Sequence, residues 1–324
     1  MELPQNIYER QKANKRNTLL VMALFTIFVG FLGLGFDVYF LHYTSDGIQL
    51  PIATIIALTL GSWNAFRSLQ NGSVTVLSSA GAIPVPENDP KYQVLRNVVD
   101  EMTIASGLPK PQLYVIPDPD PNAFATGKDP EHAAIAVTEG LIDKLNREEL
   151  QGVIAHEMSH VRNYDIRMMT VVAALVGSVM LLSEVAMRTG RFGVGRRRSS
   201  SSRSGGAGAI MFVVWLVAIV LAPLIARILA MAVSRQREYL ADASGAELTR
   251  NPKALASALE KIDSAVEPTR SIKKGTAHLC IADPLGRSIN KKEGFFAEVF
   301  GTHPPISKRI MVLQSMAFQG NATT

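Results

Sequence analysis

The sequence GVIAHEMSHVRNYD at residues 152–165 runs directly into the apolar stretch IRMMTVVAALVGSVMLLS at residues 166–183. His156 and His160 are four residues apart, and residues at that spacing lie on one face of a helix. Two imidazoles in this arrangement can bind one metal ion, and Glu157 stands beside the first of them as a candidate general base. The stretch therefore predicts a hydrolytic metal site that is joined directly to a membrane segment.

A catalytic zinc ion takes three protein ligands and keeps a fourth position open for water, so the two histidines need a partner. Glu184 follows His160 by 24 residues, and a continuous helix would place it about 36 Å away, which is out of reach. Glu238, in QREYLADASG, follows the last long apolar stretch of the chain. An up-and-down hairpin would return Glu238 to the level of HEMSH, which makes it the candidate third ligand.

Two further carboxylates are candidates for supporting the metal ligands. Asp242 lies one helical turn after Glu238, where it can accept a hydrogen bond from a ligand imidazole and fix its tautomer. Asp165 is close to His160, but a step of five residues turns it off the ligand face and suits a supporting or capping role. Carboxylates four apart are also common on solvated helices, so the spacing of Glu238 and Asp242 alone does not decide their role.

The composition predicts a membrane protein. Of the 324 residues, 47% are apolar and 19% are charged, against about 25% charged in soluble domains. Cys280 is the single cysteine, which excludes an internal disulfide and a cysteine-based zinc finger and favours a small buried side chain. The net charge of +5 is concentrated in the N-terminus and in a Ser/Arg-rich stretch. In a membrane protein such charge sets topology or meets anionic lipid, and no nucleic-acid-binding pattern accompanies it.

Four apolar stretches are candidate membrane segments, at residues 18–41, 50–66, 168–183 and 207–226. Residues 1–17 carry four Lys and Arg residues and the loop after the first stretch carries none, so the positive-inside rule puts the N-terminus in the cytoplasm. Four crossings would leave the linker at 188–206, with its six arginines, on the far side of the membrane. The active site is still expected in the cytoplasm. A re-entrant hairpin formed by the third and fourth stretches is the alternative.

The rest of the chain has the pattern of an α+β domain that is mostly helical with a small sheet. Asp89-Pro90 predicts a helix start and Gly107 its end, and Asn146 predicts the N-cap of the helix that carries HEMSH. Asn251 followed by proline predicts another cap. The expected strands are PQLYVI at 111–116 and HAAIAVTEG at 132–140, and the expected later helices are residues 234–249 and 251–266.

Three motifs in this order resemble the HtpX family of membrane zinc endopeptidases: HEMSH with its apolar continuation, REYLAD at 237–242 and THPPISKR at 302–309. That family is similar to the CAAX prenyl endopeptidases. The likeness spans essentially the whole chain, whereas HEMSH alone would not be specific. It implies an integral membrane, mainly α protein with about four transmembrane helices. A cytoplasmic α+β zincin-like protease domain with a small sheet completes the expected fold.

The resemblance also implies roles for the candidate site residues. His156, His160 and Glu238 match the ligands of one zinc ion per chain. Glu157 matches the general base beside them. Asp242 matches an acidic residue one turn beyond the third ligand, which supports the ligands from behind.

The resemblance adds five residues around this centre. His303 matches a histidine that helps to hold the substrate or the developing oxyanion, and Arg309 is expected close to the site. Asn122, Ala123 and Phe124 match the edge strand that pairs with an extended substrate. Structural alternatives remain open: His303 can simply start the last helix, Arg309 can pair with a carboxylate, and Asn122 can be a turn residue.

The expected organisation divides the protease domain into two pieces separated by membrane. The segments are a basic cytoplasmic N-terminus at 1–17, a membrane hairpin at 18–66, a first protease piece with HEMSH at 67–165, a second membrane hairpin at 166–233 with the flexible 188–206 linker, and a second protease piece with the third ligand at 234–324. The second hairpin then joins the first two ligands to the third, so the site is expected at the bilayer surface.

The predicted function is that of a zinc metalloendopeptidase in the cell (plasma) membrane, multi-pass, with its active site facing the cytoplasm. The family implies a role in stress response and in quality control of misfolded or damaged membrane proteins. The expected partners are the lipid bilayer and protein or peptide substrates, without nucleic acid. Two alternatives stay open: specific processing of lipidated or signal-like peptides, and a non-catalytic zinc-stabilised membrane scaffold. Three ligands plus a base favour catalysis, because structural zinc usually has four protein ligands.

Overall fold

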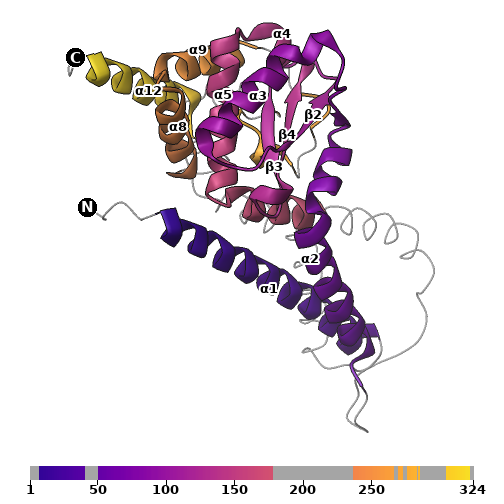
Figure 1. Cartoon of the computed structure of the whole chain (residues 1–324). Coiled ribbons are helices and arrows are strands. Elements are labelled where there is room, and N and C mark those ends of the chain that lie inside the picture. Colours follow the sequence, from indigo (N-terminus) through magenta and orange to yellow (C-terminus); the bar gives the residue numbers. More distant parts are fainter. Residues whose placement is uncertain are drawn as a thin grey trace.

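The computed structural model describes residues 7–40, 50–177, 236–265, 269–272, 276–282, 284 and 304–321. The fourth apolar stretch, the linker, Glu184 and His303 lie outside these residues, and the third apolar stretch is described only as far as residue 177. The described part of the chain is mainly helical with one small sheet, as the sequence predicts (Figure 1).

The elements follow one another in a mixed order. The helices are α1 (Ile7–Phe40), α2 (Ile52–Ser79), α3 (Gln93–Ser106), α4 (Glu139–Lys144), α5 (Arg147–Arg162), α8 (Gln236–Thr249), α9 (Pro252–Asp263) and α12 (Ile306–Asn321). The strands are β1 (Ile83–Pro84), β2 (Gln112–Ile116), β3 (Ala123–Thr126) and β4 (Ala134–Thr138). Short 3₁₀ helices are η1 (Pro90–Tyr92), η2 (Pro130–His132) and η3 (Ala277–Leu279), and residues 165–177 are helical as well.

The sheet has the strand order β1-β2-β4-β3, so β3 is an edge strand beside β4. β2 runs parallel to β4 with Leu113 opposite Ile135, and β3 runs antiparallel to β4 with Phe124 opposite Ala136. Every residue of β3 and β4 is buried. Such continuous burial is typical of strands that are covered on both faces.

Alternate residues of β3 and β4 enter two different cores, because successive side chains point to opposite faces of a sheet. Ala125 and Ile135 join the core that α3, α5 and α9 build on one face. Phe124 and Ala136 join the core on the other face, where helix 165–177 packs with residues of α1 and α2. The helix that carries HEMSH and the helix that follows it thus cover opposite faces of the sheet.

α1 and α2 form a closely packed pair (Figure 1). A Cβ atom on Gly33 would lie 2.8 Å from the Cα atom of Thr54, so the missing side chain lets the two backbones approach. Asp37 of α1 accepts hydrogen bonds from the backbone N–H groups of Ala53 and Thr54 at 2.9 and 2.7 Å. This carboxylate satisfies N–H groups that the start of α2 would otherwise leave unpaired, and its charge suits a helix N-terminus.

The segment Gln11–Gly35 of α1 is the one stretch of described helix that is long and apolar enough to cross a membrane, with a mean hydropathy of 2.3. α1 begins at Ile7, ahead of the expected membrane segment at Thr18, because the intervening Ala, Gln, Lys and Arg residues are good helix formers. Large apolar side chains stand exposed on α1 and α2, among them Leu19, Leu20, Leu24, Ile27, Ile55, Ile56, Leu60, Trp63 and Phe66. Faces of this kind fit lipid better than water.

α5 begins at the N-cap that the sequence predicts, Asn146, whose side chain accepts from the backbone N–H of Glu149 at 2.9 Å. The Glu149 carboxylate in turn accepts a hydrogen bond from the Asn146 backbone N–H at 2.9 Å and another from Lys261 at 2.7 Å, and the second bond ties α5 to α9. Although burial acts the other way, the hydrogen bond from Lys261 holds the pKa of Glu149 below its usual value of 4.5.

The change Glu149→Gln should lower the free energy of unfolding at pH 7 by about 1–2 kcal/mol, because it removes a charged acceptor from this junction. A lowered carboxylate pKa stabilises the folded state above the usual value of 4.5, and this stabilisation is lost as the pH falls through the lower folded-state pKa. The gap in thermal midpoint between variant and wild type should therefore narrow below pH 4.5. Glu148→Gln, at an exposed neighbour, is the control. Equal midpoints at pH 7 for Glu149→Gln and wild type would contradict this prediction.

Candidate active site

α8 packs against α5 at the level of HEMSH because Gly245 leaves room for the two backbones. A Cβ atom on Gly245 would lie 3.0 Å from the backbone nitrogen of His156 and 3.2 Å from its Cα atom. This close approach brings the carboxylates of Glu238 and Asp242, on α8, within 4 Å of the His156 ring. A residue without a side chain is thus part of what forms the site.

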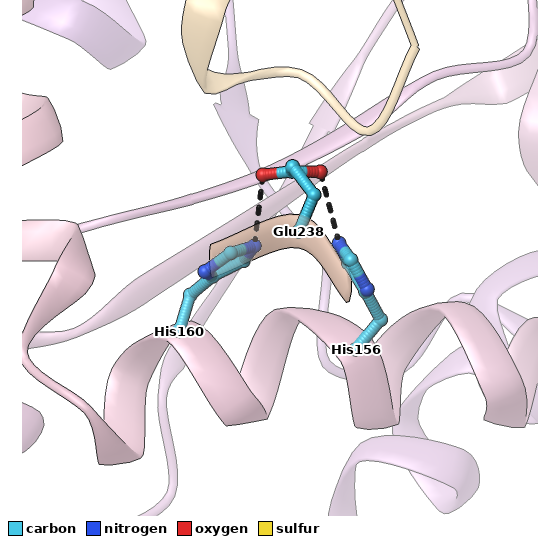
Figure 2. Close-up of side chains that lie close together, drawn as sticks. All are labelled: His156, His160 and Glu238. Carbon is cyan, nitrogen blue, oxygen red and sulfur yellow. Dashed lines mark ion pairs between the residues drawn. The ribbon is translucent and has the colours of Figure 1, made fainter. Parts of the chain in front are cut away.

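Figure 2 shows the three side chains that meet between the helices: His156 and His160 rise from α5, and the Glu238 carboxylate spans the gap between their rings. Nε2 of His156 lies 3.8 Å from one Glu238 oxygen, and Nε2 of His160 lies 3.5 Å from the other. All three residues are buried, and their candidate ligand atoms lie within 4.8 Å of one another. Ligands about 2.1 Å from a tetrahedral zinc ion lie about 3.4 Å apart, so the cluster has the dimensions of a zinc site.

The second ring nitrogen of His156 faces Asp242. Nδ1 and the Asp242 oxygen lie 2.9 Å apart, although at an angle outside the range of a good hydrogen bond. Arg309 holds the same carboxylate in a two-point contact at 2.7 and 2.8 Å and donates to the Ile281 carbonyl at 2.8 Å. Its guanidinium is fully buried and lies 3.4 Å from Glu238. Although burial acts the other way, Arg309 holds the pKa of Asp242 below its usual range.

Asp165 faces the other histidine, with its Oδ2 atom 3.1 Å from Nδ1 of His160. α5 ends at Arg162, and Tyr164 adopts a left-handed conformation with φ of 58°, which turns the chain back toward the ligand helix. On a continuous helix the step of five residues would point Asp165 away, so this contact depends on the turn. Burial alone would lower the pKa of His160. The hydrogen bond with Asp165 and the charge of Glu238 nevertheless raise this pKa to about 9.

Glu157 is buried beside the two histidines and is poorly paired. Within the described part of the chain neither carboxylate oxygen has a hydrogen bond of normal geometry, although the backbone N–H of Ala125 lies nearby. Burial raises the pKa of Glu157, against the opposing effect of the His156 and His160 imidazoles. A buried carboxylate without a hydrogen bond is costly unless it meets a further group, and in an open site that group is water or substrate.

The residues expected to form the substrate edge have structural contacts of their own. Asn122 is fully buried, and its amide nitrogen donates to the Ala282 carbonyl at 3.1 Å. The Ala123 carbonyl accepts from the backbone N–H of Ile281 at 2.9 Å. Phe124 lies in the core on the sheet face away from α5. Their role toward a substrate therefore stays a prediction.

One residue of β3 still directs its main-chain N–H and C=O groups toward the candidate metal site. Hydrogen-bonded pairs alternate along an antiparallel ladder, and Thr138 donates to the Asn122 carbonyl at 3.0 Å. The N–H and C=O groups of Ala123 and Ala125 therefore point away from β4. Because the Ala123 carbonyl is already used, Ala125 beside Glu157 is the position of this edge that faces the site.

Two of the remaining predicted residues have different outcomes. Arg309, near the start of α12, reaches the centre of the site, where it contacts Asp242. His303 lies outside the described residues, so its role stays a prediction.

Sequence reasoning missed two residues that shape this region, Gly245 and Asn14. A glycine inside a helical pattern often has a packing reason, and that was the available signal for Gly245. Asn14 donates to Asp165 at 2.8 Å from α1. Its signal was its position at the head of a buried helix face that continues through Thr18, Val21 and Phe25.

The change Gly245→Val should push α8 away from α5 and separate Glu238 from the two histidines, because the new side chain would meet the backbone at His156. A displacement of about 1 Å in a catalytic site can lower the rate by roughly 100-fold. The zinc affinity expected for this cluster and the proteolysis that the resemblance implies should both fall, measured on purified protein. Glu247→Val, at an exposed position of the same helix, controls for the lower helix propensity of valine. Wild-type zinc affinity in Gly245→Val would contradict the packing argument.

Two histidines on one helix, a glutamate from a later helix and a poorly paired carboxylate beside them define a metallopeptidase of the HExxH class. The sequence profile of peptidase family M48 matches residues 90–317. The chain is 43% identical to the protease HtpX homolog of Thermoanaerobacter pseudethanolicus over 312 residues, which covers 96% of this chain and 98% of that one. The homolog of Ligilactobacillus salivarius is 42% identical over 310 residues, with coverage of 96% and 100%.

The chain therefore belongs to peptidase family M48, and the resemblance to the HtpX proteases is confirmed. It is a membrane-bound metalloprotease, with peptides or proteins as its substrates. Among solved structures, the crystal structure of Ste24p from S. mikatae matches with a TM-score of 0.48 and 16% sequence identity. That match covers 95% of this chain and 66% of Ste24p.

Proposed function

We propose that this metalloprotease is a zinc-dependent endopeptidase, active at the cytoplasmic surface of the membrane, and that its substrates are misfolded or damaged membrane proteins. The observation that carries the proposal is the buried cluster of His156, His160 and Glu238 with the poorly paired Glu157 beside it. Two imidazoles and one carboxylate are a common ligand set for catalytic zinc, and they leave a fourth position for water.

The roles of the side chains follow from this cluster. A zinc ion bound there would polarise the substrate carbonyl and lower the pKa of water from about 15.7 to about 7. Glu157, which lies buried beside the two histidines and has no well-formed hydrogen bond among the described residues, would take the proton of the attacking water and pass it to the leaving amine. Asp242 and Asp165 would hold the rings of the two ligand histidines in orientation.

The substrate would lie in extended form beside β3. Ala125 supports this proposal, because its main-chain groups point away from β4 and lie next to Glu157. Asn122 and its neighbours Ala123 and Phe124 would then shape the edge from behind. His303 precedes α12, the helix that carries Arg309, and it remains the candidate for holding the developing oxyanion.

The proposed topology has four membrane segments, with the N-terminus and both protease pieces in the cytoplasm. The exposed apolar side chains of α1 and α2 and the four basic residues before Thr18 support the first hairpin. Residues 166–233 would form the second hairpin and join HEMSH to Glu238. Substrates presented in or near the bilayer would then reach the site without leaving the membrane surface.

The test is zinc content and proteolysis of the purified full-length protein in detergent. We expect about one zinc ion per chain, loss of casein cleavage on chelation and recovery when zinc is restored. Glu238→Ala should lose its zinc, whereas the exposed control Glu247→Ala should keep it. A destabilised membrane protein should be cleaved faster than its stable parent. Zinc-free protein that still cleaves would refute the proposal, and intact casein beside a cleaved lipidated peptide would favour the narrower processing role.

A further inference from the structure

The turn that follows the HEMSH helix is held by α1. Gln11 donates to the Arg162 carbonyl at 2.8 Å, and Asn14 donates to the Asn163 carbonyl at 2.8 Å. The same amide nitrogen of Asn14 donates to Oδ1 of Asp165 at 2.8 Å. Both N–H groups of one buried amide are thus used on residues that lie about 150 positions later in the chain.

A further contact from α1 meets the middle of this turn. The Lys15 ammonium group lies 4.1 Å from the centre of the Tyr164 ring. Tyr164 is the residue with the left-handed φ of 58°, a conformation that a bulky side chain keeps only when its surroundings hold it. The bonds from α1 on either side of Tyr164 supply that support.

Asp165 is the point at which α1 meets the candidate metal site. Its Oδ1 atom accepts the hydrogen bond from Asn14 and lies 3.3 Å from Nη1 of Arg237. Its Oδ2 atom lies 3.1 Å from Nδ1 of His160. In Figure 2 one ring nitrogen of His160 is turned away from Glu238, and this is the nitrogen that Asp165 reaches. Asn14, Asp165 and His160 are exposed by only 6%, 3% and 3%, so water cannot readily replace a lost partner.

Apolar side chains alone would be enough to pack α1 against the rest of the protein. The buried polar residue Asn14 therefore serves a specific hydrogen-bonded contact. Thr18, Val21 and Phe25 continue the helix face of Asn14 and are buried. Val21 and Phe25 belong to the core shared with α2 and helix 165–177. A buried asparagine at the head of this row costs desolvation free energy unless its donors are used. Here the donors are used on the turn and on the carboxylate that faces His160.

We propose that Asn14 is a positioning residue of the active site: from the membrane helix α1 it holds Asp165, and Asp165 in turn orients His160 for the metal ion. The proposal rests on the zinc site of the proposed function. Removing a group that orients a metal-ligating imidazole commonly lowers metal affinity by roughly 10- to 100-fold. Arg237 also lies near the same oxygen of Asp165. Removing Asn14 should therefore lower zinc affinity by an amount at the lower end of this range, about tenfold.

The experiment measures the zinc affinity of the purified full-length protein by competition with a chromophoric chelator. Asn14→Ala leaves space at the turn and Asn14→Leu fills it, and thermal unfolding checks that each variant is folded. Gln11→Leu is the matched control, since it removes a bond from α1 to the same turn without touching Asp165. Asp165→Ala, alone and combined with Asn14→Ala, completes a double-mutant cycle.

We expect each Asn14 variant to weaken zinc binding about tenfold and Gln11→Leu to weaken it less than about twofold. In the Asp165→Ala background the Asn14 change should add nothing, because its effect passes through that carboxylate. Unchanged zinc affinity in both Asn14 variants would overturn the proposal. So would a loss of zinc affinity of about tenfold that Asn14→Ala also causes in the Asp165→Ala background. Both outcomes leave the zinc site of the wild type in place. A wild-type protein that binds no zinc would overturn the proposed function together with this inference.

Discussion

In the Glu157→Gln variant we expect zinc to stay bound while proteolysis falls by roughly 100- to 10,000-fold. Glutamine has nearly the shape of glutamate, but its amide cannot take a proton from water. Because neither Glu157 oxygen has a well-formed hydrogen bond within the described residues, no neighbouring side chain depends on its charge for a hydrogen bond. Zinc content and casein cleavage of the purified protein measure the two expectations separately.

Glu148→Gln provides the matched control for this experiment. Glu148 is an exposed residue of the same helix, so its variant should cleave at the wild-type rate. Full activity in Glu157→Gln would remove Glu157 from the mechanism as the general base. Loss of zinc together with activity would instead assign Glu157 to holding the metal ion.

The second large effect is expected for Arg309→Ala, which should lower the free energy of unfolding by about 3–5 kcal/mol. Arg309 is fully buried and holds Asp242 at two points, so alanine would leave that carboxylate buried without its counter-charge. The Asp242 oxygen lies 2.9 Å from Nδ1 of His156, so zinc affinity should fall as well. Thermal unfolding and zinc titration of the full-length protein measure these losses.

Two variants calibrate the Arg309 result. Arg309→Lys keeps the charge but loses the planar two-point contact, so it should be intermediate in stability. Gln314→Ala removes an exposed hydrogen bond from the same helix and should leave the thermal midpoint nearly unchanged. If Arg309→Ala unfolds at the same thermal midpoint as the wild type, the buried ion pair of Arg309 and Asp242 contributes little to the stability of the folded state.

Much of the candidate site could be predicted because its geometry is local. The spacing of His156 and His160 on one helix follows from the sequence, and so does that of Glu238 and Asp242 on another. The orientation of Asp165 could not be predicted, because it depends on the left-handed backbone conformation of Tyr164. No sequence pattern indicated that conformation. The contact from α1 was missed for a different reason, since it joins distant parts of the chain through tertiary packing.

The elements of the fold were predictable where capping residues mark them. Asn146 and Asn251 each accept a hydrogen bond from the first turn of the helix that the sequence assigns to them. The strand order could not be derived, because long-range pairing decides it and β1 consists of only Ile83–Pro84. Helix limits also differ: α2 continues beyond the expected end at Phe66 to Ser79, because no proline stops it.

α1 is fastened at two points, by Asn14 to the turn after α5 and by Asp37 to the start of α2. These two residues are 23 positions apart, which corresponds to about 35 Å along a helix, close to the roughly 30 Å hydrocarbon thickness of a bilayer. In the proposed topology α1 spans the bilayer, and a helix fastened at both ends cannot slide along its axis relative to its neighbours to suit a thinner or thicker bilayer. It has to tilt together with α2 or deform the surrounding lipid. In that topology the thickness of the host membrane would bear on the turn that follows the HEMSH helix.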